Sequence, residues 1–267
     1  LREFGPVVEV HTLPAREAIE LKRGDILTRG KLSDATVQTI RVAALDEQAC
    51  AKPISSECAE ALATVTGVAT DRRLAALSEL WLAQAQAMKP GSAQQAAWLE
   101  TIRYAYAYLF LGDHTPGERA FEDRQTQVRD WYNYAVEHAA TGMFEVRQQM
   151  PTHLPVHTSW DIAGWDLKLD MRGARLPGTT AVPAELLPAS SLSFRGLRSL
   201  YRRDGFGAEL VAVIPDESLS AVPTRGGRPA AKHDQQPLPW SEMPAPSMTV
   251  LLHPDGDNLD SVLHART

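Results

Sequence analysis

Residues 70–110 read TDRRLAALSELWLAQAQAMKPGSAQQAAWLETIRYAYAYLF and contain the strongest structural pattern in the first half of the chain. In residues 70–88 the apolar side chains recur every three or four positions, which is the spacing of one helical face. Pro90 and Gly91 end this helix, because neither residue favours its continuation. Ser92 is the expected N-cap of a second helix that fills the rest of the stretch. The pattern therefore predicts two helices that pack as antiparallel neighbours.

Helical signals continue on both sides of this pair. Ser33 is a good N-cap for a helix that reaches about Leu45, and a short helix is expected over residues 56–65. A long helix is expected over residues 118–140. We therefore predict that residues 1–150 form a mostly helical domain of antiparallel helices, with one tetratricopeptide-like pair and a third helix.

The pattern changes after residue 150. Trp165, Leu167, Leu169 and Met171 alternate with charged residues, which is typical of a half-buried strand. The apolar runs 208–214 and 248–252 predict two further strands.

The segments between these strands are rich in proline and glycine. Residues 176–190 read as a crossing loop, and residues 215–246, which hold seven prolines, form a long irregular segment. A turn and a small helix are expected after Asp255. The fold class is thus α+β: an N-terminal antiparallel helical region, then a β-rich region over residues 151–267 with a long Pro-rich loop.

Composition excludes some function classes. The 267 residues hold 27 Lys and Arg against 33 Asp and Glu, a net charge of −6, whereas nucleic-acid binding usually needs a basic face. We expect no nucleic-acid partner and no membrane span, since no run of about 18 apolar residues occurs. The first residue is Leu1 rather than Met, which fits a removed leader or a trimmed chain.

The chain has two cysteines, Cys50 and Cys58, with seven residues between them. Two interpretations are open: one short disulfide, or two buried free thiols. No matching ligand pair lies nearby, so a zinc site is not expected. The sequence predicts no metal site and no cofactor.

No serine shows the pattern of a hydrolase nucleophile. The strand-to-helix elbow of an α/β-hydrolase needs small neighbours, seen as G-x-S-x-G, and this pentapeptide does not occur. Ser92 reads as a helix cap, and Ser190, Ser191 and Ser193 have no glycine on the near side. We therefore assign no catalytic residue.

Two clusters have the residue types of metal ligands. His153 and His157 are four apart, but the neighbouring prolines argue against the helix that would align them. Asp255, Asp257 and Asp260 offer the oxygen atoms that calcium prefers. A solvated turn explains this acidic stretch better than a calcium loop.

Two patterns suggest ligand binding without naming a ligand. The glycines at 205 and 207 read as a turn that leads into a strand rather than as a phosphate-binding loop. The aromatic residues of the helices would line a groove or, as we favour, pack in the core and under the C-terminal half; they are Tyr104, Tyr106, Tyr108, Phe110, Trp131, Tyr132 and Tyr134.

Four stretches together resemble the N-terminal part of a family of bacterial exported, often lipoprotein-like, α/β-hydrolases. They are residues 26–36 (ILTRGKLSDAT), 104–110 (YAYAYLF), 131–136 (WYNYAV) and 205–213 (GFGAELVAV). In that family a helical region precedes a β-rich segment, and the serine elbow comes later. The sequence ends at Thr267 before any such elbow, so no catalytic residue is carried over.

The resemblance implies an accessory portion of a secreted serine esterase or lipase-like hydrolase, in which the strands begin the hydrolase sheet or form a sandwich that covers it. Its expected partner is a hydrolase catalytic region, in the same or a separate chain. Its expected location is exported: periplasmic, anchored to the outer membrane, or extracellular. The alternative is a helical adaptor that binds a peptide or protein without catalysis.

Overall fold

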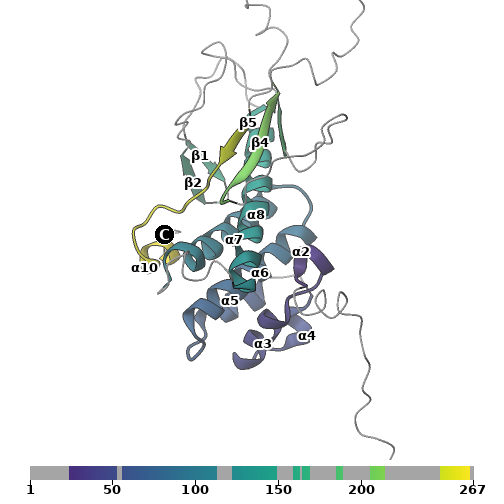
Figure 1. Ribbon diagram of the computed structural model, residues 1–267, viewed down its shortest axis with the longest axis vertical. Helices are drawn as coiled ribbons and strands as arrows, with labels where there is room; N and C mark the ends of the chain where they lie inside the picture. The colour runs from purple at the N-terminus through teal and green to yellow at the C-terminus, as the bar shows by residue number, and fades with distance from the viewer. Residues whose placement is uncertain are drawn as a thin grey trace, which may run out of the picture.

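The computed structural model describes residues 24–52, 56–112, 122–148, 159–162, 164–168, 185–188, 205–213 and 247–264. Helices come first and strands follow, so the predicted α+β class is confirmed (Figure 1). The helices are α2 (Ile26–Arg29), α3 (Asp34–Val42), α4 (Glu47–Cys50), α5 (Glu57–Thr64), α6 (Thr70–Ala87), α7 (Ser92–Phe110), α8 (Asp123–Gln148) and α10 (Leu259–His264). The strands are β1 (Ser159–Ile162), β2 (Trp165–Lys168), β3 (Glu185–Pro188), β4 (Ala208–Val213) and β5 (Ser247–Val250).

The predicted pair of helices is α6 and α7, and α7 lies between α6 and α8. The turn between them is closed by the Gln94 amide, which donates to the carbonyls of Ala85 at 2.9 Å and Met88 at 3.1 Å. The expected capping role of Ser92 is wrong. Gly91 takes the N-cap position and Ser92 is the first helical residue, with no side-chain cap.

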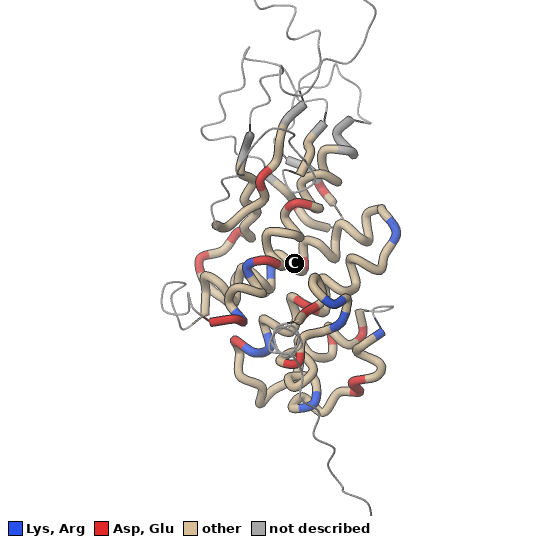
Figure 2. Tube along the Cα trace, turned by 45° about the vertical axis from the view of Figure 1, so that its right-hand side comes forward, with Lys and Arg blue, Asp and Glu red and all other residues tan. Residues whose placement is uncertain are grey.

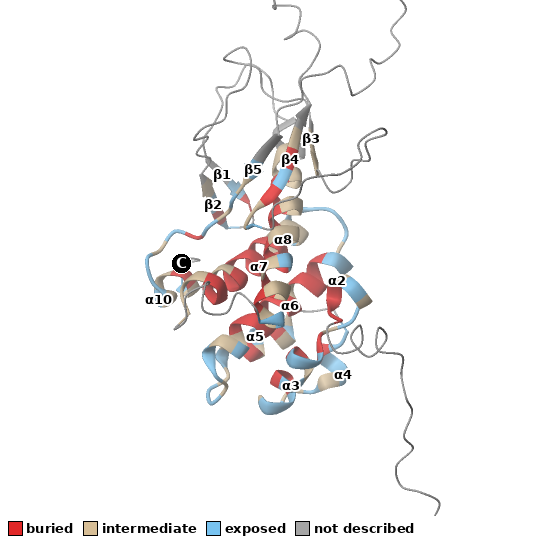
Figure 3. Ribbon diagram, in the orientation of Figure 1, coloured by how far each residue is buried: buried red, intermediate tan, exposed pale blue. Residues whose placement is uncertain are grey.

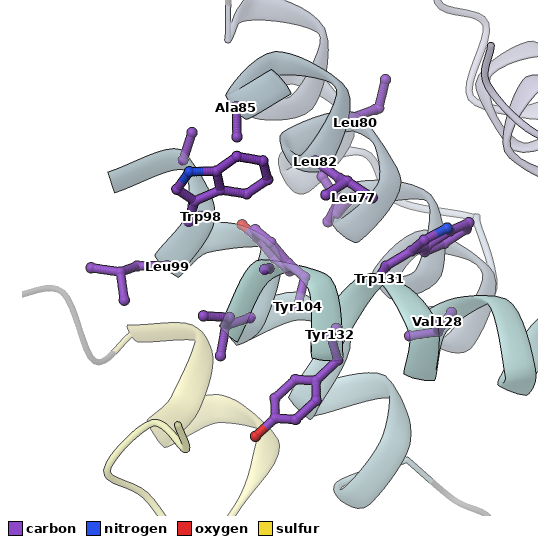
Figure 4. Packing of buried hydrophobic residues seen from close by; sticks show 14 of the residues in the cluster. Leu77, Leu80, Leu82, Ala85, Trp98, Leu99, Tyr104, Val128, Trp131 and Tyr132 are labelled. Atoms are coloured by element: carbon purple, nitrogen blue, oxygen red, sulfur yellow. The ribbon is translucent and has the colours of Figure 1, made fainter. Parts of the chain in front are cut away.

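The core lies between these three helices (Figures 3 and 4). Leu77 and Leu82 of α6 and Trp131 of α8 are almost fully buried. Each such side chain contributes about 1.5–3 kcal/mol by leaving water. Alanines lie fully buried among them and let the helix backbones approach: Ala75, Ala76, Ala85, Ala105, Ala107, Ala135 and Ala139.

Helix α8 is longer at its C-terminal end than the predicted helix, which stopped at Ala140. Gly142 lies within the helix, where the side chain of Gln95 on α7 takes the space beside it. A Cβ atom at Gly142 would lie 1.7 Å from Nε2 of Gln95 on α7. Beyond the helical layer, α8 also contacts β3, β4 and β5, so it joins the helices to the strands (Figure 1).

The strands form two antiparallel sheets. β1 and β2 make a hairpin in which Ile162 faces Trp165, and β3, β4 and β5 form a sheet with β4 in the centre. The predicted strands at β2, β4 and β5 are confirmed. β3 falls in the segment that reads as a loop, and that part of the interpretation is wrong. β3 is an outer strand of the described sheet and ends at Pro188. Proline is tolerated there because an outer strand pairs on one side alone, so the missing N–H donor is less needed.

Among the described helices, none combines the length and apolar character needed to cross a membrane.

Candidate functional site

A buried carboxylate lies at the centre of the candidate site. Glu79 of α6 is fully buried, and such a charge is tolerated only when neighbouring groups satisfy it. Its Oε1 accepts hydrogen bonds from the backbone N–H groups of Ile26 at 3.2 Å and Ser33 at 2.8 Å. Its Oε2 accepts from the Ser33 hydroxyl at 2.6 Å and lies 3.7 Å from Nη1 of Arg124.

Arg124, in the first turn of α8, supplies the matching positive charge. Its Nη1 donates to Oγ of Ser33 at 2.8 Å, and its Nη2 donates to Oγ1 of Thr36 at 2.7 Å. The guanidinium also lies over the Trp131 ring, 4.9 Å from the centroid, in a favourable cation–π position. Burial lowers the pKa of Arg124, and the carboxylate of Glu79 opposes that change.

Trp131 extends these contacts to α2. Its indole N–H donates to Oδ2 of Asp25 at 2.9 Å, and Oδ1 of Asp25 caps α2 by accepting from the backbone N–H of Thr28 at 3.0 Å. We call the connected residues the buried polar network: Asp25, Ser33, Thr36, Glu79, Arg124 and Trp131.

The chemistry of the network centres on Ser33, whose hydroxyl faces a carboxylate as a nucleophile faces its base. The hydroxyl gives its proton to Glu79 and accepts from Arg124 and from the backbone N–H of Thr36 at 3.3 Å. One proton and two lone pairs are the whole capacity of a hydroxyl, so none is left to attack a substrate. The arrangement therefore fits a structural role, which is to fix α2 and α3 against α6 and α8.

A groove of about 540 Å³ lies beside the network, a volume within the range of small-molecule sites. Arg124 belongs to both the network and the groove. The groove is lined by Ala35, Gln38, Thr39, Val42, Gly67, Val68, Ala69, Asp71, Arg72, Ala75, Tyr108, Glu122 and Arg124.

A second set of contacts joins α8 to the strands. The Asn133 side chain donates to the carbonyl of Gly205 at 2.9 Å and accepts from the N–H of Gly207 at 2.7 Å. The Tyr132 hydroxyl donates to the carbonyl of Leu252 at 2.6 Å, and burial raises the pKa of this phenol. These bonds fix the start of β4 and the end of β5 on the helix.

Arg103 of α7 makes a similar contact with α10. Its guanidinium pairs with Glu100 and donates to the carbonyl of Leu263 at 2.8 Å. It also lies 5.7 Å from the centre of the Trp165 ring, so one buried cation contacts both α10 and the β1–β2 hairpin.

The aromatic residues lie where we expected, in the core and under the C-terminal half. Tyr104 and Tyr108 are buried, and Phe110 packs on Phe206 with ring centroids 4.8 Å apart. Gly205 and Gly207 form the turn before β4. Gly207 has φ +105°, and a Cβ there would lie 2.7 Å from the carbonyl oxygen of Val250, so glycine is required.

The two cysteines form a disulfide between α4 and α5, with Cα atoms 5.3 Å apart. Ser190, Ser191, Ser193, His153 and His157 lie outside the described residues.

Asp255, Asp257 and Asp260 are exposed around the start of α10. Within the described part of the chain, no three His, Cys, Asp or Glu residues gather as a metal site would require.

Sequence reasoning found Ser33 as a helix cap but missed Glu79 and Arg124. The available signal was a carboxylate within the apolar run of α6, where Leu77, Leu80 and Leu82 surround it. Such a residue needs a buried partner, although its identity follows only from the fold.

No protein-family model, curated protein or solved structure matches this chain. The resemblance to exported α/β-hydrolases therefore remains a prediction that rests on the four quoted stretches.

Proposed function

We propose that this chain is the accessory portion of a secreted serine esterase or lipase-like hydrolase, and that its helices are a platform for the first strands of the hydrolase sheet. The observation that carries the proposal is the pair of hydrogen bonds made by the Asn133 side chain, which donates to the carbonyl of Gly205 and accepts from the N–H of Gly207. It supports the proposal because it sets the position of β4, the central strand of its sheet, from the helical layer.

The contacts of Tyr132 and Arg103 support the same role. They bind the ends of β5 and α10 through side chains that are themselves buried in the helical core. A platform needs this rigidity, because supporting side chains must be fixed before they can fix a sheet.

The disulfide between Cys50 and Cys58 supports an exported location. Disulfides persist in oxidising compartments such as the bacterial periplasm and are rare in the cytosol. Closing a loop of this size stabilises a fold by about 2–3 kcal/mol in the chain-entropy model.

The first test uses the purified chain alone, with p-nitrophenyl butyrate as substrate and a fluorophosphonate as covalent probe of active serines. We expect neither turnover nor labelling, because the accessory portion does not supply the nucleophile. A matched variant carries alanine at Ser190, Ser191 and Ser193. Turnover by the chain, whether or not it survives in this variant, would show that a nucleophile lies within these residues and would overturn the accessory role.

The alternative is a non-enzymatic adaptor that binds a peptide or another protein. Tyr104 and Tyr108 are buried, so these two rings offer little surface to such a partner. Purification of the chain with its partner from the native extract separates the two functions. A serine hydrolase polypeptide supports the accessory role, and an unrelated protein supports the adaptor.

A further inference from the structure

The Cys50–Cys58 disulfide connects two segments that border the groove. It joins α4 to α5. α4 follows α3, whose residues Thr39 and Val42 line the groove, and α5 precedes the lining residues 67–69. The position of α3 relative to residues 67–69 is thus restrained by a covalent bond that a reductant can break.

Helix α4 has little packing of its own. Of its four residues, all of which the structure describes, Cys50 alone is buried. The described helices carry charged residues of both signs (Figure 2), and the exposed side chains of Arg41 on α3 and Glu47 on α4 form one ion pair among them. Exposed ion pairs contribute little to stability. α4 therefore depends on the disulfide for its position.

The turn between α3 and α4 contains backbone strain. Ala44 has φ +56°, a left-handed conformation that residues with a Cβ atom seldom adopt. Such a conformation persists where the surrounding structure enforces it. The backbone N–H groups of Ala43, Ala44 and Leu45 donate to carbonyls of α3, so the turn and the end of that helix would loosen together.

The rest of α3 is held by contacts that do not involve the disulfide. Ser33, its N-cap, donates to Glu79 in the buried polar network, and Ile40 is fully buried. Loss of the disulfide should therefore loosen residues 41–50, which include Val42 of the groove lining, and leave the start of α3 in place.

We propose that this disulfide is a redox-sensitive switch: an external dithiol reduces it, residues 41–50 loosen, and the groove loses its fixed shape at Val42. This switch is independent of the proposed hydrolase role. It acts on helices alone and requires no nucleophilic serine.

The reduction proceeds by thiol–disulfide exchange. Cys58 is partly exposed and Cys50 is buried, so a thiolate of the reductant attacks Sγ of Cys58 and Cys50 leaves as a thiolate. The second thiol of the reductant then attacks its own sulfur in the mixed disulfide and releases Cys58. The two cysteines take up the two protons that the reductant loses, and the reductant leaves as a disulfide.

The test is amide hydrogen exchange of the purified chain before and after treatment with dithiothreitol, followed by mass spectrometry. We expect exchange in residues 41–46 to become about tenfold faster or more on reduction, because the local opening no longer has to overcome the cross-link. Residues 77–85 of α6 are the internal reference and should exchange as before.

Two sets of variants separate the cross-link from the strained turn. The chain with Cys50→Ala and Cys58→Ala should exchange as the reduced parent does, with or without dithiothreitol. Adding Ala44→Gly to it should slow exchange in residues 41–46 about threefold, since glycine adopts a positive φ without strain. Ala43→Gly is the matched control, because Ala43 has φ −73° and should gain no such relief.

Four results would overturn the proposal. They are a disulfide that dithiothreitol cannot reduce in the folded chain, unchanged exchange in residues 41–46 after reduction, an equal rise in residues 77–85, and equal effects of Ala44→Gly and Ala43→Gly. The third result would make the disulfide a general stabiliser of the helical layer rather than a local switch.

Discussion

Glu79 shows how a single residue sets the arrangement of four helices. It accepts three hydrogen bonds from the segment that holds α2 and α3, although it belongs to α6. Buried charge pairs of this kind add little stability compared with apolar packing, yet breaking one is costly. Glu79 therefore acts chiefly by favouring one arrangement of these helices over others.

Replacing Glu79 with Gln should lower the free energy of unfolding by about 3 kcal/mol, because the mostly buried Arg124 would lose its counter-charge and a Gln amide cannot replace both carboxylate acceptors. Urea unfolding followed by circular dichroism measures this change. Glu60→Gln is the matched control, since Glu60 is exposed on α5. An equal effect of the two substitutions would contradict a special role for the buried carboxylate.

His138 makes the stability of the helical layer depend on pH. Its ring stacks on Trp98 with centroids 4.8 Å apart, and burial lowers the pKa of His138. The unfolded chain, where the pKa of histidine is about 6.5, then binds a proton more readily than the folded chain. The stabilising effect of the neutral His138 ring is present above the pKa of the unfolded chain. It is lost as the pH falls toward the lower pKa of His138 in the folded state.

We therefore expect His138→Phe, which keeps an aromatic ring on Trp98, to reduce the fall in melting temperature between pH 7.5 and pH 5. His264→Gln changes an exposed histidine and should leave the fall unchanged. Differential scanning calorimetry at several pH values makes the comparison. A fall as steep in His138→Phe as in the parent chain would contradict this account.

At the scale of elements, the helices with strong periodicity could be predicted, as could the short helices α5 and α10, whereas α2, α4 and β3 could not. The α6 and α7 boundaries follow from apolar spacing and from Pro90 and Gly91, since both signals are local. α2 and α4 are each four residues long, too short for a period to show, although Asp25 and Asp46 cap them. β3 was missed because its pairing with β4 is a long-range contact that no local pattern encodes.

The candidate site was harder to predict than the helices, for a physical reason. The buried polar network connects residues between Asp25 and Trp131. Its ion pair and its hydrogen bonds join residues that are far apart in the sequence, so they form no sequence motif. The sequence marks Ser33 because capping is local. It does not mark Arg124, whose role depends on where α8 packs.

The contact between α8 and β4 makes a further prediction at this scale. Asn133→Ala removes both hydrogen bonds to the turn before β4, so amide hydrogen exchange in residues 205–213 should become at least several-fold faster. Mass spectrometry resolves this segment. Asp130→Asn changes an exposed position on the same helix and should leave the exchange unaltered.

Exchange in residues 205–213 that is the same in Asn133→Ala and in the parent chain would show that the strand is held by other contacts. The platform role would then lose the observation that carries it.

At the scale of the whole molecule, α8 connects the helical region with the β-rich region. It contributes Trp131 to the helical core and contacts every strand of the three-stranded sheet (Figure 1). The change in sequence pattern near residue 150 thus marks a change from helices to strands, and α8 keeps the two regions in contact. This connection is what the proposed platform requires.

The platform role can be tested on the native protein. An antibody against residues 24–112 would recover it from its source after fluorophosphonate labelling, and mass spectrometry would locate the labelled serine. The platform role predicts one labelled serine in the recovered material, outside residues 1–267, either further along the same polypeptide or on a tightly bound one. Recovered material with no labelled serine, or with the label on a serine inside residues 1–267, would contradict it.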